Sequence, residues 1–147
     1  TAGSQATACP VVFEKRFAPQ LPMINVVKRD LSKVLLNILN NSYYEVFRKW
    51  KLVGENYSPN IRIITQLKEN RILITVADNG DGVAEDQLDK IFEPFFTTKP
   101  AGEGVGLGLS ISNDIIRSYG GKIAYSKEQK DGSGEKLSVF TISIPLQ

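Results

Sequence analysis

Three short stretches of this chain combine residues that could do chemistry. The first is NILNN at 37–41, which carries two asparagines four residues apart. The second is DNGDG at 78–82, in which Asp78 precedes glycines at alternate positions, and the third is GEGVGLGLS at 102–110. Each stretch also has an ordinary structural explanation, so each has to be weighed on its own.

The two asparagines of the first stretch, Asn37 and Asn41, project to one face of a helix, because residues four apart lie one above the other. Tyr44 continues the same line. An amide at the margin of a core needs hydrogen-bond partners, and the plain explanation is that these amides bond to neighbouring loops or to water. The chemical alternative is a hard cation. Mg²⁺ takes oxygen ligands and keeps several waters, so a protein often supplies only one or two groups and substrate phosphates supply others.

Asp78 follows a strongly apolar run and stands at the start of an Asp-x-Gly-x-Gly pattern. A calcium loop is excluded, because its third position requires an oxygen ligand and here holds Gly80. A plain turn stays possible, since Asn-Gly and Asp-Gly are common turn signals. The alternative is a purine site, because a carboxylate accepts a hydrogen bond from adenine's exocyclic amine and repels guanine's carbonyl. Gly80 and Gly82 would then let the backbone pass close to a flat base.

The third stretch has glycine at every second position from 102 to 108, directly before an expected helix. Glycine-rich backbone at a helix N-terminus presents N–H groups that bind phosphate. The dinucleotide pattern G-x-G-x-x-G would need glycine at Leu107 or Leu109, and the lysine of the phosphate loop is missing. A flexible hinge is the structural alternative, and it explains four evenly spaced glycines less well.

These stretches are placed by an alternation of strand-like and helix-like segments, which predicts a single α/β or α+β domain. An apolar stripe at three- and four-residue steps marks the core side of the first helix. Its members are Leu31, Val34, Leu35, Ile38, Leu39, Ser42 and Val46. We expect strands at 11–17, 61–67, 71–77, 122–128 and 136–144, an extended piece at 23–27, helices at 28–50 and 107–119, and a short helix around 85–91.

Composition limits the possible functions. A chain of 147 residues with 41% hydrophobic residues suits one soluble domain, and its longest apolar stretches are too short to cross a bilayer. A net charge of +2, with the basic residues spread out, gives no support for nucleic-acid binding. The single cysteine, Cys9, favours a reducing compartment. The chain has no histidine, so imidazole chemistry must come from another chain or domain.

In their order along the chain, the three stretches resemble the motifs of the ATP-binding catalytic domain of sensor histidine kinases. That domain lies in the wider superfamily of gyrase, heat-shock chaperone and mismatch-repair ATPases. IFEPFFTTK at 91–99 resembles the family's phenylalanine-rich box, and the similarity runs from about Val11 to Leu146. The resemblance implies a two-layer α/β (α+β) sandwich of the Bergerat type, with a mixed, mostly antiparallel sheet and about three helices on one face. Residues 1–10 are then a flexible leader or linker remnant, 11–147 the domain, and 83–103 a lid over ATP.

The resemblance also implies cofactors and site residues. The cofactors are ATP and Mg²⁺, with Asn41 as the metal residue and Asp78 as the adenine contact. Lys99 is expected to reach a terminal phosphate. Many relatives place Lys or Arg soon after the metal asparagine, where this chain has Ser42 to Glu45, so which side chain supplies that cation stays open. The expected nucleotide contacts are Asn37, Asn41, Tyr44, Asp78, Gly80, Gly82, Lys99, Gly104, Val105, Gly106, Leu107, Gly108 and Leu109.

Two further expectations concern the lid and the last motif. Phe92, Phe95 and Phe96 are expected to anchor the lid against the body of the domain or a partner domain, with ordinary core packing as the close alternative. The C-terminal motif from 131 onward carries extra residues at 135–139, and we assign no ligand contact to it.

The reaction follows from what the residues lack. The ATPase branch of the superfamily places a glutamate at the position of Asn37, and a neutral amide cannot remove a proton from water. We therefore expect a histidine protein kinase rather than a rapid hydrolase, with the acceptor histidine on a separate dimerisation and histidine-phosphotransfer domain. Alternatives that stay open are a serine kinase of the type that restrains a sigma factor, a non-catalytic ATP-sensing module, and a chaperone-like or DNA-associated ATPase, which Asn37 argues against.

The resemblance implies partners and a location. The partners would be the dimerisation domain of a homodimeric parent protein and the receiver domain of a response regulator. The piece itself is expected to be monomeric, with no nucleic acid and no membrane contact. We expect a cytoplasmic location, including that of the cytoplasmic part of a membrane-bound sensor.

Overall fold

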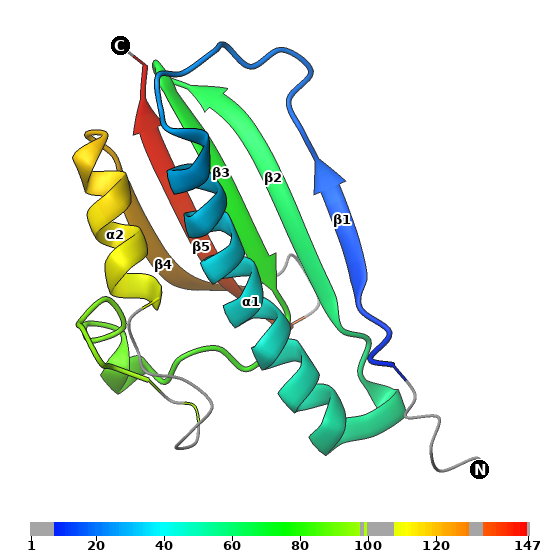
Figure 1. Cartoon of the computed structure of the whole chain (residues 1–147). Coiled ribbons are helices and arrows are strands. Elements are labelled where there is room, and N and C mark those ends of the chain that lie inside the picture. The colour runs from blue at the N-terminus through cyan, green and yellow to red at the C-terminus, as the bar shows by residue number, and fades with distance from the viewer. Residues whose placement is uncertain (1–7, 98, 100–107, 130–133, 147) are drawn as a thin grey trace.

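Five strands form one sheet in the order β1-β2-β3-β5-β4 (Figure 1). The computed structural model describes residues 8–97, 99, 108–129 and 134–146. Only β1 and β2 pair in parallel, and the other neighbours are antiparallel, which confirms a mixed, mostly antiparallel sheet. Each strand lies within one residue of its predicted ends, whereas the extended piece at 23–27 joins no sheet. The strands are β1 (Val12–Arg16), β2 (Asn60–Lys68), β3 (Arg71–Asp78), β4 (Lys122–Gln129) and β5 (Lys136–Pro145).

The β2–β3 hairpin is tighter than the three-residue connection expected from the sequence. Lys68 pairs with Arg71, so only Glu69 and Asn70 form the loop, with φ of 53° and 60°. Two central residues in the left-handed region are the mark of a type I′ turn, whose twist matches that of the strands. This register sets Ile61 opposite the last residue of β3.

Two α-helices, α1 (Lys28–Val53) and α2 (Gly108–Ser118), cover one face of the sheet (Figure 1). In α1 the fully buried positions are Val34, Ile38, Ser42 and Val46, at the predicted four-residue spacing. α2 ends as predicted: Gly120 has a φ of 76°, and the Gly121 N–H donates to the Ile116 carbonyl at 3.0 Å.

The expected third helix around 85–91 is only a 3₁₀ turn, η3 (Glu85–Gln87), followed by further turns. A similar short piece, η2 (Gly54–Asn56), follows α1. A helix of one to two turns is marginal without tertiary support, and Pro94 prevents its extension. Thus two α-helices, rather than about three, are found within the described part of the chain.

The core lies between the helices and the inner face of the sheet. Its sheet members are Ile61, Ile72, Ile74, Val76, Ile123, Phe140, Ile142 and Ile144. Phe92 and Phe96 pack against this core, whereas Phe95 is 73% exposed at a φ of 68°. Phe92 and Phe96 thus contact the body of the domain, which agrees both with anchoring of the lid and with ordinary core packing. None of the helices among the described residues is long and apolar enough to cross a membrane.

Candidate functional site

A cavity of about 250 Å³ opens between α1, the start of α2 and one end of the sheet. Residues from all three predicted stretches line it, namely Asn37, Asn41, Asp78, Gly82, Gly108 and Leu109, and so does Lys99 of the phenylalanine-rich segment at 91–99. Gly80 and Tyr44 do not line the cavity, but each touches a residue that does. Gly104, Val105, Gly106 and Leu107 lie outside the described residues, as do 98 and 100–103 of the predicted lid. The structure thus brings together distant parts of the sequence that were predicted to meet.

The two asparagines of α1 have fixed side-chain orientations. The Asn37 amide nitrogen donates to the Gly108 carbonyl at 3.2 Å and to the Ser112 hydroxyl at 3.1 Å, which ties α1 to α2. The Asn41 amide nitrogen donates to the Asn37 carbonyl at 3.0 Å. A carbonyl can only accept, so in both side chains the amide oxygen must face the other way.

The Asn41 oxygen suits a hard cation. Asn41 lines the cavity, and no described residue donates a hydrogen bond to its side-chain oxygen. The described residues contain no cluster of three His, Cys, Asp or Glu side chains that could hold a metal by themselves. A divalent cation here would need most of its oxygen ligands from a bound ligand and from water, which is the usual pattern for Mg²⁺ with phosphates.

Asp78 ends β3 with 2% of its surface exposed. Its carboxylate accepts a hydrogen bond from the Gly80 N–H at 2.9 Å. Burial raises the Asp78 pKa to about 7. The hydrogen bond from the Gly80 N–H has the opposite effect, because it favours the charged form. The charge of Glu45 raises the pKa further, and Lys49 opposes it. Asp78 therefore changes charge near neutral pH.

The Ser42 hydroxyl lies one turn after Ile38 in α1 and is almost fully buried. Its position close to Asp78 lowers the pKa of that carboxyl. It nevertheless makes no hydrogen bond of ordinary geometry with any described residue. A buried hydroxyl without a good partner is costly, so the Ser42 oxygen is a polar group that a ligand or water could complete.

Glycine is required at 80 and 82 for space. A Cβ atom at Gly80 would lie 3.0 Å from both Asp78 Oδ1 and Glu45 Cβ. Gly82 has a φ of 71°, and a Cβ there would lie 2.5 Å from the Tyr125 hydroxyl. Close packing and a left-handed backbone thus explain the Asp-x-Gly-x-Gly spacing beyond an ordinary turn.

Sequence reasoning missed the sheet residues at the cavity. Tyr125 on β4 and Ser138 on β5 line it, and their hydroxyls bond to each other. The Tyr125 hydroxyl also accepts from the Val83 N–H at 3.0 Å, which holds the start of the predicted lid. We assigned no ligand contact to the C-terminal motif, yet Ser138 lines the cavity. The available signal was a serine among apolar residues on the buried face of β5.

Lys99 is a cation at the cavity, and the sequence had left open which side chain supplies the positive charge near the phosphates. The Lys99 ammonium lies 4.7 Å from the centre of the Tyr44 ring and lines the cavity. The aromatic face attracts the cation and restricts the lysine. Glu45, which also lines the cavity, is paired with Arg48 at 3.1 Å.

Known proteins share both the sequence pattern and the fold. The family model described as histidine kinase-, DNA gyrase B- and HSP90-like ATPase matches residues 26–147. Sensor histidine kinase ZraS of Salmonella typhi is 36% identical over 116 residues, covering 79% of this chain. Sporulation kinase E of Bacillus subtilis is 33% identical over 144 residues, covering 98% of this chain. The solved catalytic domain of histidine kinase ThkA superposes with a TM-score of 0.72 at 27% identity, covering 94% of this chain and 82% of that one.

The similarity covers a limited part of the two longer kinases. This chain spans 22% of the length of ZraS and 18% of the length of sporulation kinase E. The match to the ThkA catalytic domain extends over most of both chains. The shared unit is therefore one domain within larger proteins.

Proposed function

The chain belongs to the family of histidine kinase-, DNA gyrase B- and HSP90-like ATPases, and on this premise we propose that it is the ATP-binding catalytic domain of a two-component sensor histidine kinase. In this proposal it positions Mg²⁺-ATP so that the γ-phosphoryl group passes to a histidine on a separate domain. The observation that carries the proposal is the buried Asp78 carboxylate in the same cavity as the Asn41 amide oxygen.

Adenine recognition is assigned to Asp78. An ionised carboxylate accepts a hydrogen bond from the exocyclic amine of adenine, and guanine places a carbonyl there instead. The carboxylate is held by the Gly80 N–H, and the lack of a side chain at Gly80 lets the backbone pack against Asp78 and Glu45. The second oxygen-bearing group beside the base would be the Ser42 hydroxyl, which is buried next to Asp78.

Phosphate and metal binding are assigned to Asn41, Lys99 and the glycine-rich stretch. The Asn41 oxygen would contribute one ligand to Mg²⁺, which when bound neutralises phosphate charge. Lys99, steadied by the ring of Tyr44, would meet a terminal phosphate. Gly104, Gly106 and Gly108 would supply backbone N–H groups along the phosphates, together with Val105, Leu107 and Leu109.

Phosphoryl transfer is favoured over hydrolysis by the side chains that line the cavity. The Asn37 amide nitrogen is held by Gly108 and Ser112, and an amide cannot take a proton from water. Besides Asp78, Glu45 is the carboxylate among the described lining residues, and its Oε2 oxygen is engaged in the ion pair with Arg48. Transfer to an outside nucleophile needs positioning and charge stabilisation, which this cavity can supply without a base of its own.

The acceptor and the partners lie outside this chain. The chain contains no histidine, so the phosphate would go to a dimerisation and phosphotransfer domain of the parent protein, and from there to a response regulator. Relatives named as a sensor histidine kinase and a sensor protein do not favour the alternative of a serine kinase that restrains a sigma factor.

Calorimetry of ATP binding with and without Mg²⁺ tests the proposal. We expect Asp78→Asn to weaken ATP binding both with and without Mg²⁺, and Asn41→Asp to weaken it chiefly without Mg²⁺, because the added carboxylate repels the phosphates but is itself an oxygen ligand for the cation. Asn25→Asp, at an exposed asparagine, is the control for the change of charge. Unchanged ATP binding in both cavity variants would refute the site. Absence of phosphate transfer to a supplied histidine domain would reduce the chain to an ATP-sensing module.

A further inference from the structure

Asn79 is a polar residue next to Asp78 that does not line the first cavity. It is 7% exposed and borders a second cavity, of about 300 Å³, together with Arg62, Ala77 and Leu137. A buried amide must be hydrogen-bonded or its burial is costly. Its partners therefore reveal what the residue holds in place.

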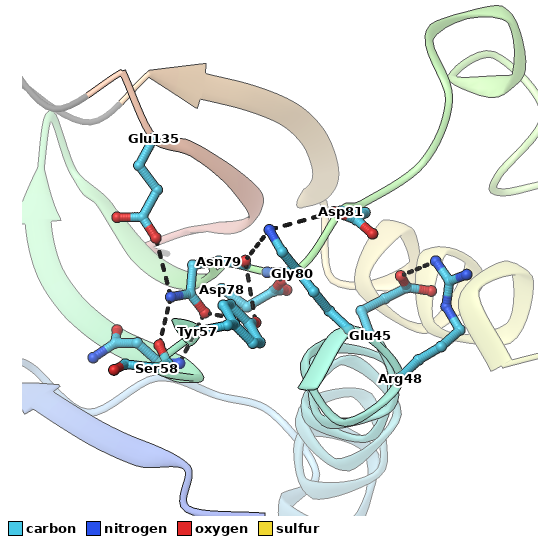
Figure 2. A network of polar contacts seen from close by, with 11 residues as sticks. Glu45, Arg48, Tyr57, Ser58, Asp78, Asn79, Gly80, Asp81 and Glu135 are labelled. Carbon is cyan, nitrogen blue, oxygen red and sulfur yellow. Dashed lines mark hydrogen bonds and ion pairs between the residues drawn. The ribbon is translucent and has the colours of Figure 1, made fainter. Parts of the chain in front are cut away.

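The Asn79 side chain makes every hydrogen bond that an amide can make (Figure 2). Its nitrogen donates to the Ser58 carbonyl at 2.8 Å and to Glu135 Oε1 at 3.1 Å. Its oxygen accepts from the Asn60 N–H at 2.8 Å and from the Tyr57 hydroxyl at 3.0 Å. Two donors and two acceptor positions are thus filled, which joins the loop before β2, the first residue of β2 and the residue before β5.

The backbone of the same turn is held from the same side. The Asn79 carbonyl lies 3.2 Å from the Tyr57 hydroxyl, whose single proton it shares with the Asn79 side-chain oxygen, and it accepts from the Lys49 ammonium at 3.4 Å. Lys49 also pairs with Asp81 Oδ1 at 3.3 Å (Figure 2). The residues on either side of Gly80 are thus fixed, and Gly80 is the residue whose N–H holds the Asp78 carboxylate.

We propose that Asn79 is a positioning residue for nucleotide recognition, which holds the Asp78 carboxylate and the Gly80 amide in the orientation that receives the base. The ligand named here rests on the proposed function, whereas the positioning itself does not. The effect passes through the backbone, because Asn79 directly follows Asp78 and its four side-chain bonds leave the turn no freedom to rotate. In the sheet, Asp78 pairs with Ile61 of β2 and Ser138 of β5, so its backbone is held on both sides up to the end of β3. Asn79 holds the chain directly after that end, where the strand pairing stops.

A residue that only stabilised the fold would behave differently. Its loss would lower the free energy of unfolding without changing ATP affinity in the molecules that stay folded. Loss of a positioning residue weakens ATP binding in fully folded protein, and restoring the hydrogen bond restores the affinity. The pair of Asn79 and Glu135 allows such a restoration, because its donor and acceptor can be exchanged at constant net charge.

The test measures ATP affinity by calorimetry at pH 7.5 and pH 9 in four proteins. These are wild type, Asn79→Asp, Glu135→Gln and the double variant. Glu135→Gln keeps an oxygen that accepts from Asn79, so its affinity should stay within about two-fold of wild type. Asn79→Asp loses both donors and should weaken ATP binding about ten-fold or more, as expected when buried acceptors lose their partner. In the double variant the amide of Gln at 135 can donate to the carboxylate of Asp at 79. ATP should therefore bind the double variant at least about three-fold more tightly than it binds Asn79→Asp.

The measurement at pH 9 separates position from charge. A carboxylate at 79 also disfavours ionisation of Asp78, whose pKa in wild type is about 7, and this effect on ATP binding shrinks as the pH rises further above that pKa. A loss that persists at pH 9 and is recovered in the double variant supports the proposal. A loss that vanishes at pH 9, or a double variant no better than Asn79→Asp, overturns it.

A second variant tests the positioning without any nucleotide and without a change next to Gly80. Tyr57→Phe removes only the hydroxyl that donates to Asn79, and Tyr43→Phe is the control at an exposed tyrosine. In ligand-free protein, the Gly80 amide resonance should move in Tyr57→Phe and stay in place in Tyr43→Phe. An unmoved Gly80 resonance in Tyr57→Phe overturns the positioning role. If wild-type protein binds no ATP, the proposed function fails while this result still decides the inference.

Discussion

Replacement of Asp78 by asparagine should make the fold more stable while it weakens nucleotide recognition. Asp78 is almost fully buried, and its raised pKa means that the folded state disfavours the charged form. Asparagine has the same shape, and its oxygen can still accept from the Gly80 N–H. The variant therefore removes the buried charge and keeps the hydrogen bond of the turn.

The size of the effect follows from linkage between proton binding and folding. The Asp78 pKa rises from 3.8 in the unfolded chain to about 7 in the fold. The folded state holds the proton more tightly, so this contribution to stability is fully present below pH 3.8 and is lost as the pH rises through about 7. At about 1.4 kcal/mol per pH unit, the raised pKa of Asp78 lowers the free energy of unfolding by about 2 kcal/mol at pH 5 and by about 4 kcal/mol at pH 8.

Urea unfolding of wild type and Asp78→Asn at pH 5 and pH 8 measures this difference directly. The gain of the variant over wild type should be about 2 to 3 kcal/mol larger at pH 8 than at pH 5. Asp89→Asn, at an exposed aspartate, controls for loss of a surface charge. An equal gain at both pH values, or a variant less stable than wild type at pH 8, would refute the assignment of a strained buried carboxylate.

Two further predictions concern the same cavity. ATP affinity should fall about ten-fold between pH 8 and pH 6, because the form that accepts from adenine is lost below a pKa of about 7, and calorimetry should find no such fall in Asp78→Asn. Gly82→Ala should lose roughly 1 to 2 kcal/mol of unfolding free energy from its left-handed backbone, plus a further loss from the clash with Tyr125. Gly134→Ala, at a φ of 74° with no atom within 4 Å of its added Cβ, should show the backbone loss alone in the same urea experiment, and equal losses in both variants would disprove the clash.

The elements that sequence reasoning predicted well are those whose pattern is local. The strands show β-branched residues in short runs, and α1 shows an apolar stripe with the period of a helix, so both were placed to within a few residues. The turn at Gly120 was predictable for the same reason, since its signal lies in adjacent residues. The helix expected at 85–91 was wrong. Its acidic residues are typical of the first turn of a helix, but Pro94 follows closely and the segment forms a series of turns.

The parts of the site that were missed depend on contacts between distant segments. Tyr125 and Ser138 enter the cavity only because β4 and β5 pair and present their inner faces there. The contact between Tyr44 and Lys99 joins a helix to the predicted lid, and no local pattern announces it. The same holds for Asn79, whose four partners come from three segments of the chain.

The distribution of satisfied and unsatisfied polar groups separates the two sides of the β3 terminus. On the side away from the first cavity, Asn79 has every donor and acceptor filled by protein. On the cavity side, the Ser42 hydroxyl lacks a well-formed bond, and the Asn41 oxygen receives none from the described residues. A buried polar group without a partner, such as the Ser42 hydroxyl, costs about 1 to 3 kcal/mol, whereas the Asn41 oxygen is only partly buried and lines the cavity. The unused hydrogen-bonding capacity therefore lies on the side where the proposed ligand would bind. The turn that carries Asp78 thus has one side whose polar groups are filled and one side that is open to the cavity, and on the proposed function recognition of the base would depend on both.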